Sequence, residues 1–206
     1  MGMRESTGTT WPSGLQTMFD ICCNEQPQPD PPEMRYYGPY NNLFLWCFCS
    51  NTLPDFVVAP RNPPLSFRSL PDIDFPDVCF VVTDFHLHPV LVAEVKDDVW
   101  ANKADLRARA DDHMRRWFNA VLPDCRLPRV YGLLVSLLGT SLRGYVCDVA
   151  TGEVEPAFAT RPNLGHTLPH DFLGGAWDLD ILSKEGFTKM KEIVDDVIAN
   201  SPLGSE

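Results

Sequence analysis

Two short apolar runs, at 78–82 and 90–95, constrain the fold of this chain more than any other feature. Both runs are rich in β-branched residues, and a short polar segment centred near His86 separates them. Such runs, joined by a polar turn, predict a β-hairpin. The rest of the chain is therefore expected to be built around one strand pair with an apolar middle.

One end of this hairpin gathers charge on a single face. Residues two apart on a strand share a face, so Glu94 and Lys96 are expected to project together, with Val95 turned into the core. Antiparallel pairing places Asp77 opposite them. Carboxylates are the ligands that Mg²⁺ prefers, and a nearby lysine can position or help to deprotonate a metal-bound water. Two close carboxylates repel, so Asp77→Asn or Glu94→Gln is expected to leave the stability of the metal-free protein unchanged or raised.

Pro76-Asp77, a spacer and Glu94-Val95-Lys96 resemble the motif of the PD-(D/E)XK nuclease superfamily, which has a restriction-endonuclease-like fold. Over about residues 33 to 198 the chain also resembles a group of fungal proteins that carry this domain. That narrower resemblance depends on five segments: 36–41, 94–96, 110–118, 131–133 and 177–180. The resemblance implies Asp77 and Glu94, with Val95 beside them, as the ligands of Mg²⁺ or Mn²⁺, and Lys96 as the catalytic lysine.

Other residues compete for the acidic positions. Asp72 and Asp74 also precede the hairpin. The hairpin register favours Asp77, with Asp74 as the reserve. The superfamily often carries a further acidic residue on its first helix, where Glu33 is the nearest candidate. A charged strand end is also commonly the solvated rim of a sheet, and this structural explanation stays open.

A long amphipathic helix is predicted after the hairpin, over residues 99–122. Its apolar residues recur at helical spacing, and Trp117 and Phe118 are expected to anchor it to the sheet. Three acid–base pairs are spaced i, i+4, which supports a helix: Asp105/Arg109, Asp111/Arg115 and Asp112/Arg116. The candidate substrate-binding residues are Lys103, Arg107 and His113. The fungal relatives usually have glutamine where this chain has His113.

The remaining elements complete a mixed α/β chain. A buried helix is expected over 40–49 and a final helix is expected after Ser183, which is a plausible cap. Strands are expected at 54–60, 129–138 and 142–149, followed by a short strand that ends near 158. This order gives the αβββαβ core that the resemblance implies, with an added C-terminal helix.

Composition suits one soluble domain. The 206 residues are 44% hydrophobic and 22% charged, the balance of a globular protein, and we expect one domain over 33–200. Serine, threonine, glycine and proline dominate residues 1–32, so a flexible tail outside the core is expected. A short helical turn or docking segment over 15–23 is the alternative. Residues 201–206 are expected to be disordered.

No apolar run approaches the roughly 18 residues of a membrane span, and no apolar signal core follows the start. We therefore expect an intracellular protein, cytoplasmic or nuclear, without a membrane partner. The seven cysteines have no zinc-ligand spacing and are expected to be reduced. The sequence contains no glycine-rich phosphate loop, so no small-molecule cofactor is expected.

These features lead to two hypotheses. The first is a Mg²⁺-dependent phosphodiesterase acting on DNA or RNA through Asp77, Glu94 and Lys96. The net charge of −11 opposes it, because nucleic-acid binders usually present a basic face. Seven of the 17 basic residues, however, lie within 103–129. The second hypothesis is a nuclease-fold module that does not cleave and binds a protein or nucleic-acid partner. A basic groove beside the site favours the enzyme, and an acidic or apolar groove favours the module.

Overall fold

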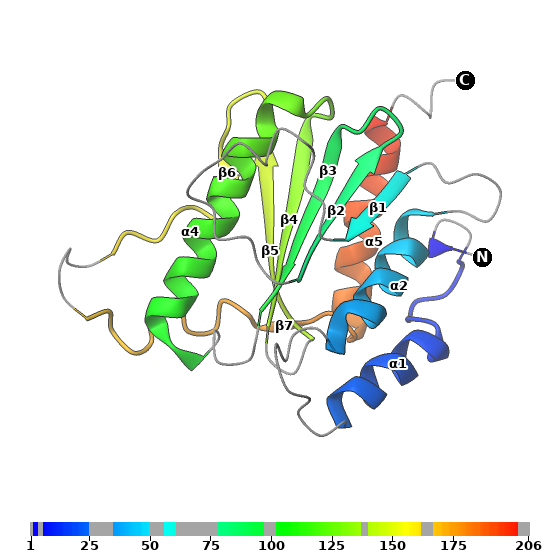
Figure 1. Ribbon diagram of the computed structural model, residues 1–206, viewed down its shortest axis with the longest axis horizontal. Helices are drawn as coiled ribbons and strands as arrows, with labels where there is room; N and C mark the ends of the chain where they lie inside the picture. The colour runs from blue at the N-terminus through cyan, green and yellow to red at the C-terminus, as the bar shows by residue number, and fades with distance from the viewer. Residues whose placement is uncertain are drawn as a thin grey trace.

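The computed structural model describes residues 2–3, 6–24, 35–49, 56–60, 78–96, 102–136, 140–161 and 167–201. Among these residues, helices cover both faces of a seven-stranded mixed sheet (Figure 1). The elements follow in the order α1 (Ser13–Asn24), α2 (Tyr37–Phe48), β1 (Phe56–Pro60), β2 (Val78–Asp84), β3 (Pro89–Val95), α4 (Ala104–Val121), a 3-10 turn (Leu122–Asp124), β4 (Arg129–Ser136), β5 (Ser141–Asp148), β6 (Val154–Glu155), β7 (Leu179–Asp180) and α5 (Lys184–Asn200).

The sheet runs β1-β2-β3-β4-β5-β6, and β7 also pairs with β5. Strands β3 and β4 are parallel, with α4 between them in the chain, and the other pairings are antiparallel. The chain from α2 to β4 follows the predicted order of one helix, three strands, one helix and one strand, and α5 is the additional C-terminal helix. The expected mixed α/β class is confirmed.

The predicted hairpin forms between β2 and β3. Val78 lies opposite Val95, and the pairing continues toward the turn. The carboxylate of Asp84 organises that turn, because one of its oxygens accepts the main-chain N–H groups of His86 and His88 at 2.9 and 2.8 Å. Strand β3 is buried along its whole length, which explains its nearly continuous apolar sequence.

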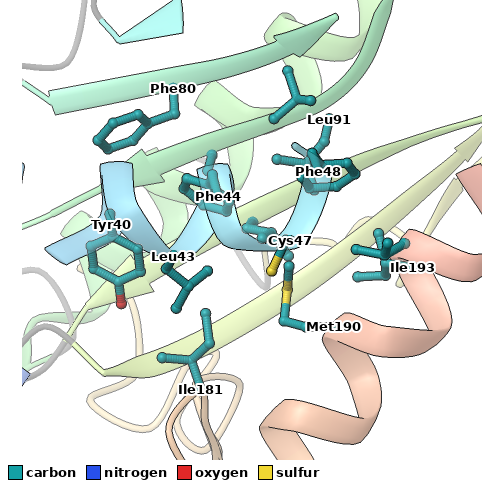
Figure 2. Packing of buried hydrophobic residues seen from close by; sticks show 14 of the residues in the cluster. Tyr40, Leu43, Phe44, Cys47, Phe48, Phe80, Leu91, Ile181, Met190 and Ile193 are labelled. Atoms are coloured by element: carbon teal, nitrogen blue, oxygen red, sulfur yellow. The ribbon is translucent and has the colours of Figure 1, made fainter. Parts of the chain in front are cut away.

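Two hydrophobic cores lie on opposite faces of the sheet. Helices α1, α2 and α5 cover one face, and α4 covers the other (Figure 1). In the first core the α2 side chains lie between the sheet and α5, as Figure 2 shows for Phe44, Cys47 and Phe48. Helix α2 therefore packs against both the hairpin and the C-terminal helix α5.

Helix α4 lies unusually close to β4. Its residues Trp117 and Phe118 are fully buried against the sheet, so the expected anchoring is confirmed. A Cβ atom at Gly132 would lie 2.6 Å from Met114 Sδ and 2.8 Å from Phe118 Cζ. Any larger residue at this position would therefore require the side chains of Met114 and Phe118 to move.

The N-terminal region is part of the first core, so the predicted flexible tail over residues 1–32 is wrong for the part that the structure describes. Met3, Trp11, Leu15 and Phe19 are buried. Trp11 donates its indole N–H to the carbonyl oxygen of Ile181 at 2.6 Å. The alternative of a docking segment is correct, because α1 presents Leu15 and Phe19 at i, i+4 on one face.

Within the described residues no helix combines the length and apolar character needed to cross a bilayer.

The predicted disordered end over residues 201–206 is wrong at its first residue. Ser201 is buried at the end of α5, and residues 202–206 lie outside the described part of the chain.

Candidate functional site

The candidate site is built around Glu94 near the end of β3. Glu94 is 0% exposed and lies between Cys79 of β2 and Leu134 of β4 in the sheet. Its side chain faces α4, whereas Val95 packs in the core on the opposite face. The expectation of a solvated sheet rim therefore fails for Glu94.

Two side chains hold the Glu94 carboxylate. His113 of α4 places Nδ1 2.9 Å from Oε1 and 3.0 Å from Oε2. The Lys96 ammonium forms an ion pair with Oε1. The side chains of Lys96 and His113 are only 12% and 13% exposed. The predicted shared face of Glu94 and Lys96 is confirmed, and both contacts are shielded from bulk water.

The charge state of Glu94 follows from these neighbours. Burial alone would raise its pKa, because desolvation disfavours a carboxylate. The hydrogen bond from His113 and the positive charge of Lys96 outweigh burial, so the pKa of Glu94 lies below its ordinary value. The site thus contains a buried, ionised carboxylate.

Helix α4 places further positive charge beside His113. Arg109 precedes His113 by four residues and Arg116 follows it by three, so the helix brings all three onto neighbouring positions of its surface. Both arginines are exposed. Two exposed arginines therefore lie near His113 on the surface of α4, together with Asp105 and Asp112 of the same helix.

Comparisons with protein-family models, with curated proteins and with solved structures gave no match. The PD-(D/E)XK resemblance therefore stays a prediction. The case for a functional site depends on the geometry of Glu94, Lys96 and His113.

Not all of the predicted acidic residues can be placed. Asp72, Asp74, Asp77 and Glu33 lie outside the described residues. Asp77 directly precedes Val78, whose pairing with Val95 agrees with the predicted register.

The predicted substrate-binding residues separate into different environments. His113 contacts Glu94 directly. Lys103 is exposed at the N-cap of α4. Arg107 is buried, and it donates from Nε to the carbonyl oxygen of Phe172 at 2.9 Å and from Nη2 to that of His170 at 2.6 Å. In the structure Arg107 therefore fastens α4 to the loop before β7.

The chemistry of Glu94 suits a divalent cation, but the described residues alone do not complete a site. A carboxylate offers about four lone-pair positions, and His113 and Lys96 make three contacts to Glu94. No group of three or more His, Cys, Asp or Glu side chains that could hold a metal ion occurs in the described part of the chain. A cation at Glu94 therefore needs a second carboxylate, and Asp77 is the candidate.

A second buried polar cluster lies under α4. The sequence predicted its Asp111/Arg115 pair but not the two residues of β5 that join it. Asp111 accepts hydrogen bonds from Arg115 Nε at 2.9 Å and from the Tyr145 hydroxyl at 2.9 Å. Arg143 Nη2 lies 3.1 Å from the same carboxylate. The alternation of Arg143 and Tyr145 along β5 was the available signal, because it places both side chains on one face.

Proposed function

We propose that this protein is a metal-dependent phosphodiesterase that acts on nucleic acid. The observation that carries the proposal is the fully buried, ionised Glu94 paired with Lys96 two residues later. Burying charge costs several kcal/mol per ion before compensation, and groups with shifted pKa values are concentrated at functional sites. Burying the charges of Glu94 and Lys96 beside α4 therefore costs free energy, and a strand with a purely structural role does not need such a pair.

Each residue has a definite role in this proposal. Glu94 and Asp77 hold Mg²⁺ or Mn²⁺, which supplies Lewis-acid stabilisation of the charge that develops on the phosphate. Lys96 orients the attacking water through its ammonium group. His113 fixes the orientation of the Glu94 carboxylate through its two short contacts. The other reactant is the attacking water, whose oxygen bonds to phosphorus as the P–O bond to the leaving group breaks. The proton that the water loses balances the proton that the leaving oxygen gains.

A nucleic-acid substrate is favoured by the charge around the site. Arg109 and Arg116 are exposed on the helix that carries His113, and arginine side chains there would meet the phosphates of a nucleic acid bound beside the site. Phosphate contacts supply most of the affinity for nucleic acid. Such local contacts are compatible with a net charge of −11.

The test is a cleavage assay with Lys96→Ala. We expect the wild-type protein to cut plasmid DNA, single-stranded DNA or RNA in the presence of Mg²⁺ or Mn²⁺. Loss of one preorganised charge at a reacting centre typically costs about 10²–10³ in rate, so Lys96→Ala is expected to lose that factor. Lys191→Ala is the matched control, because Lys191 is 39% exposed on α5, where it pairs with Asp195 on the opposite face of the sheet. Equal rates for wild type and Lys96→Ala would contradict the proposal.

A second candidate function is a non-cleaving interaction module. The observation that favours it is that Glu94 is already paired with Lys96 and in contact with His113. The same preparations distinguish the two functions when DNA and RNA binding is measured by fluorescence anisotropy. Binding that depends on Arg109 and Arg116, without cleavage by the wild type under either metal, supports the module.

A further inference from the structure

The outer edge of β5 is paired at its two ends and open in its middle. Strand β7 pairs at Ser141 and Leu142, and β6 pairs at Val146 and Cys147. Among the described residues, no strand pairs with 143–145 on this side. An open strand edge is a template for another extended chain.

Gly144 is the residue whose main chain faces this opening. Asp148 donates its N–H to Glu153 on the β6 side at 2.9 Å. The next residue, Val149, donates instead to Pro128, which precedes β4. Main-chain groups alternate between the two edges of a strand, and the β4–β5 register is unbroken. The N–H and C=O groups of Gly144 therefore point outward, into the gap between β6 and β7.

An open groove of about 930 Å³ lies over this gap. Gly144 is exposed, and a Cβ atom there would meet no other atom within 4 Å. Tyr131, Leu142 and Ile193 contribute apolar surface to the groove. Its volume is within the roughly 300–1,000 Å³ of typical ligand sites, so it can hold a few residues of a peptide.

The groove carries excess negative charge. Four carboxylates line it: Asp148, Glu153, Glu155 and Asp178. Each of its three cations pairs with a carboxylate that is not part of the lining: Arg129 with Asp196, Arg143 with Asp111, and Lys189 with Glu192. Asp148 also accepts hydrogen bonds from the N–H and hydroxyl groups of Thr151. The lining thus carries four carboxylates against three cations that are each paired elsewhere, which favours a basic ligand.

Arg143 lies beside Gly144 in the lining of the groove. Its side chain is 7% exposed, pairs with Asp111 and stacks on the rings of Tyr145 and Trp177. Its charge is therefore held within the protein and does not offset the carboxylates of the groove.

We propose that this groove binds a short, extended, basic peptide segment of a partner protein. The segment hydrogen-bonds to the main chain of Gly144 and places lysine or arginine side chains against the four carboxylates. Recognition of this kind takes affinity from main-chain hydrogen bonds and specificity from side-chain contacts. A second copy of this chain is a poor occupant, because two acidic edges would repel.

The proposal is tested by selecting peptides from a random seven-residue phage library on the full-length protein. Enriched peptides are expected to carry lysine or arginine among β-branched residues. Synthetic peptides are then titrated by fluorescence anisotropy against wild type and Gly144→Ile, which adds a branched side chain where a Cβ atom meets no other atom within 4 Å. We expect binding at least about tenfold weaker for Gly144→Ile, which corresponds to the loss of roughly one main-chain hydrogen bond. On binding, the Gly144 amide should exchange its hydrogen more slowly.

A second variant keeps the test valid if Gly144→Ile lowers the melting temperature. Glu155→Gln with Asp178→Asn is expected to weaken binding about tenfold, and added salt should weaken it further. Asp195→Asn, which removes an exposed carboxylate of α5 outside the groove, should bind like wild type. No enrichment, enrichment of acidic peptides, or equal binding by the groove variants would overturn the proposal. A dimer of the wild type that Gly144→Ile dissociates would assign the groove to a second copy instead.

Discussion

Deletion of residues 1–24 is expected to abolish cooperative unfolding of the domain. Trp11 and Phe19 are buried in the first core, and Phe19 packs edge-on against Tyr40 with ring centroids 5.0 Å apart. Removing one large aromatic side chain from a core costs about 3–5 kcal/mol. The deletion removes two of them, against a typical total stability of about 5–15 kcal/mol. Urea unfolding followed by circular dichroism measures the effect.

Point variants in α1 control for the length of the deletion. Phe19→Ala is expected to lower the free energy of unfolding by about 3–5 kcal/mol. Ile21→Ala changes the same helix at a side chain that is 52% exposed, and it should stay within about 0.5 kcal/mol of wild type. If the truncated chain unfolds at the same urea concentration as the full chain, the packing of α1 described above is wrong.

Lys96→Met is expected to destabilise the metal-free protein by about 3 kcal/mol. Breaking a buried ion pair costs roughly 3–5 kcal/mol because one charge is left uncompensated, and His113 still contacts Glu94 in the variant. Adding Glu94→Leu to Lys96→Met should recover most of the loss, since an apolar pair of similar volume often replaces a buried ion pair without cost. The free energies of unfolding of the four proteins form a double-mutant cycle. Additive effects of the two substitutions would show that the ion pair does not form.

The same contacts reverse one expectation from the sequence. Glu94→Gln was expected to leave the metal-free stability unchanged or raised by relieving repulsion with Asp77. In the structure Glu94 is compensated by Lys96 and His113, so Glu94→Gln should instead lower stability by leaving Lys96 without its counter-charge. The folded-state pKa of Glu94 is lowered. Its contribution to stability is therefore present above the ordinary pKa of a glutamate and is lost as the pH falls through the folded value.

Local patterns predicted the elements that depend on neighbouring residues. The β-branched runs gave the hairpin, and the charge alternation gave the shared face of Glu94 and Lys96. Ser183 caps α5 as predicted, with its hydroxyl oxygen accepting the Gly186 N–H at 2.9 Å. Each of these signals lies within a few residues, so no knowledge of tertiary packing was needed.

Contacts between distant segments were harder to predict. Asp111 pairs with Arg115 at i, i+4 as expected, but Asp112 pairs with Arg161 and not with Arg116. The hydrogen bond from Trp11 to Ile181 joins residues 170 positions apart. It was not predicted, because the proline-rich composition of residues 1–32 indicated a flexible tail. Such pairings depend on which elements the fold brings together, which periodicity does not reveal.

The proposed metal site at Glu94 is tested by measuring the melting temperature of the protein as Mg²⁺ or Mn²⁺ is added. A cation that binds only the native state stabilises it by RT ln(1 + [L]/Kd), about 2.7 kcal/mol at a hundredfold excess over Kd. We expect a rise in melting temperature for wild type and Lys96→Ala, and none for Glu94→Gln or Asp77→Asn. A wild type that does not respond, or variants that all respond as the wild type does, would contradict a metal site at Glu94.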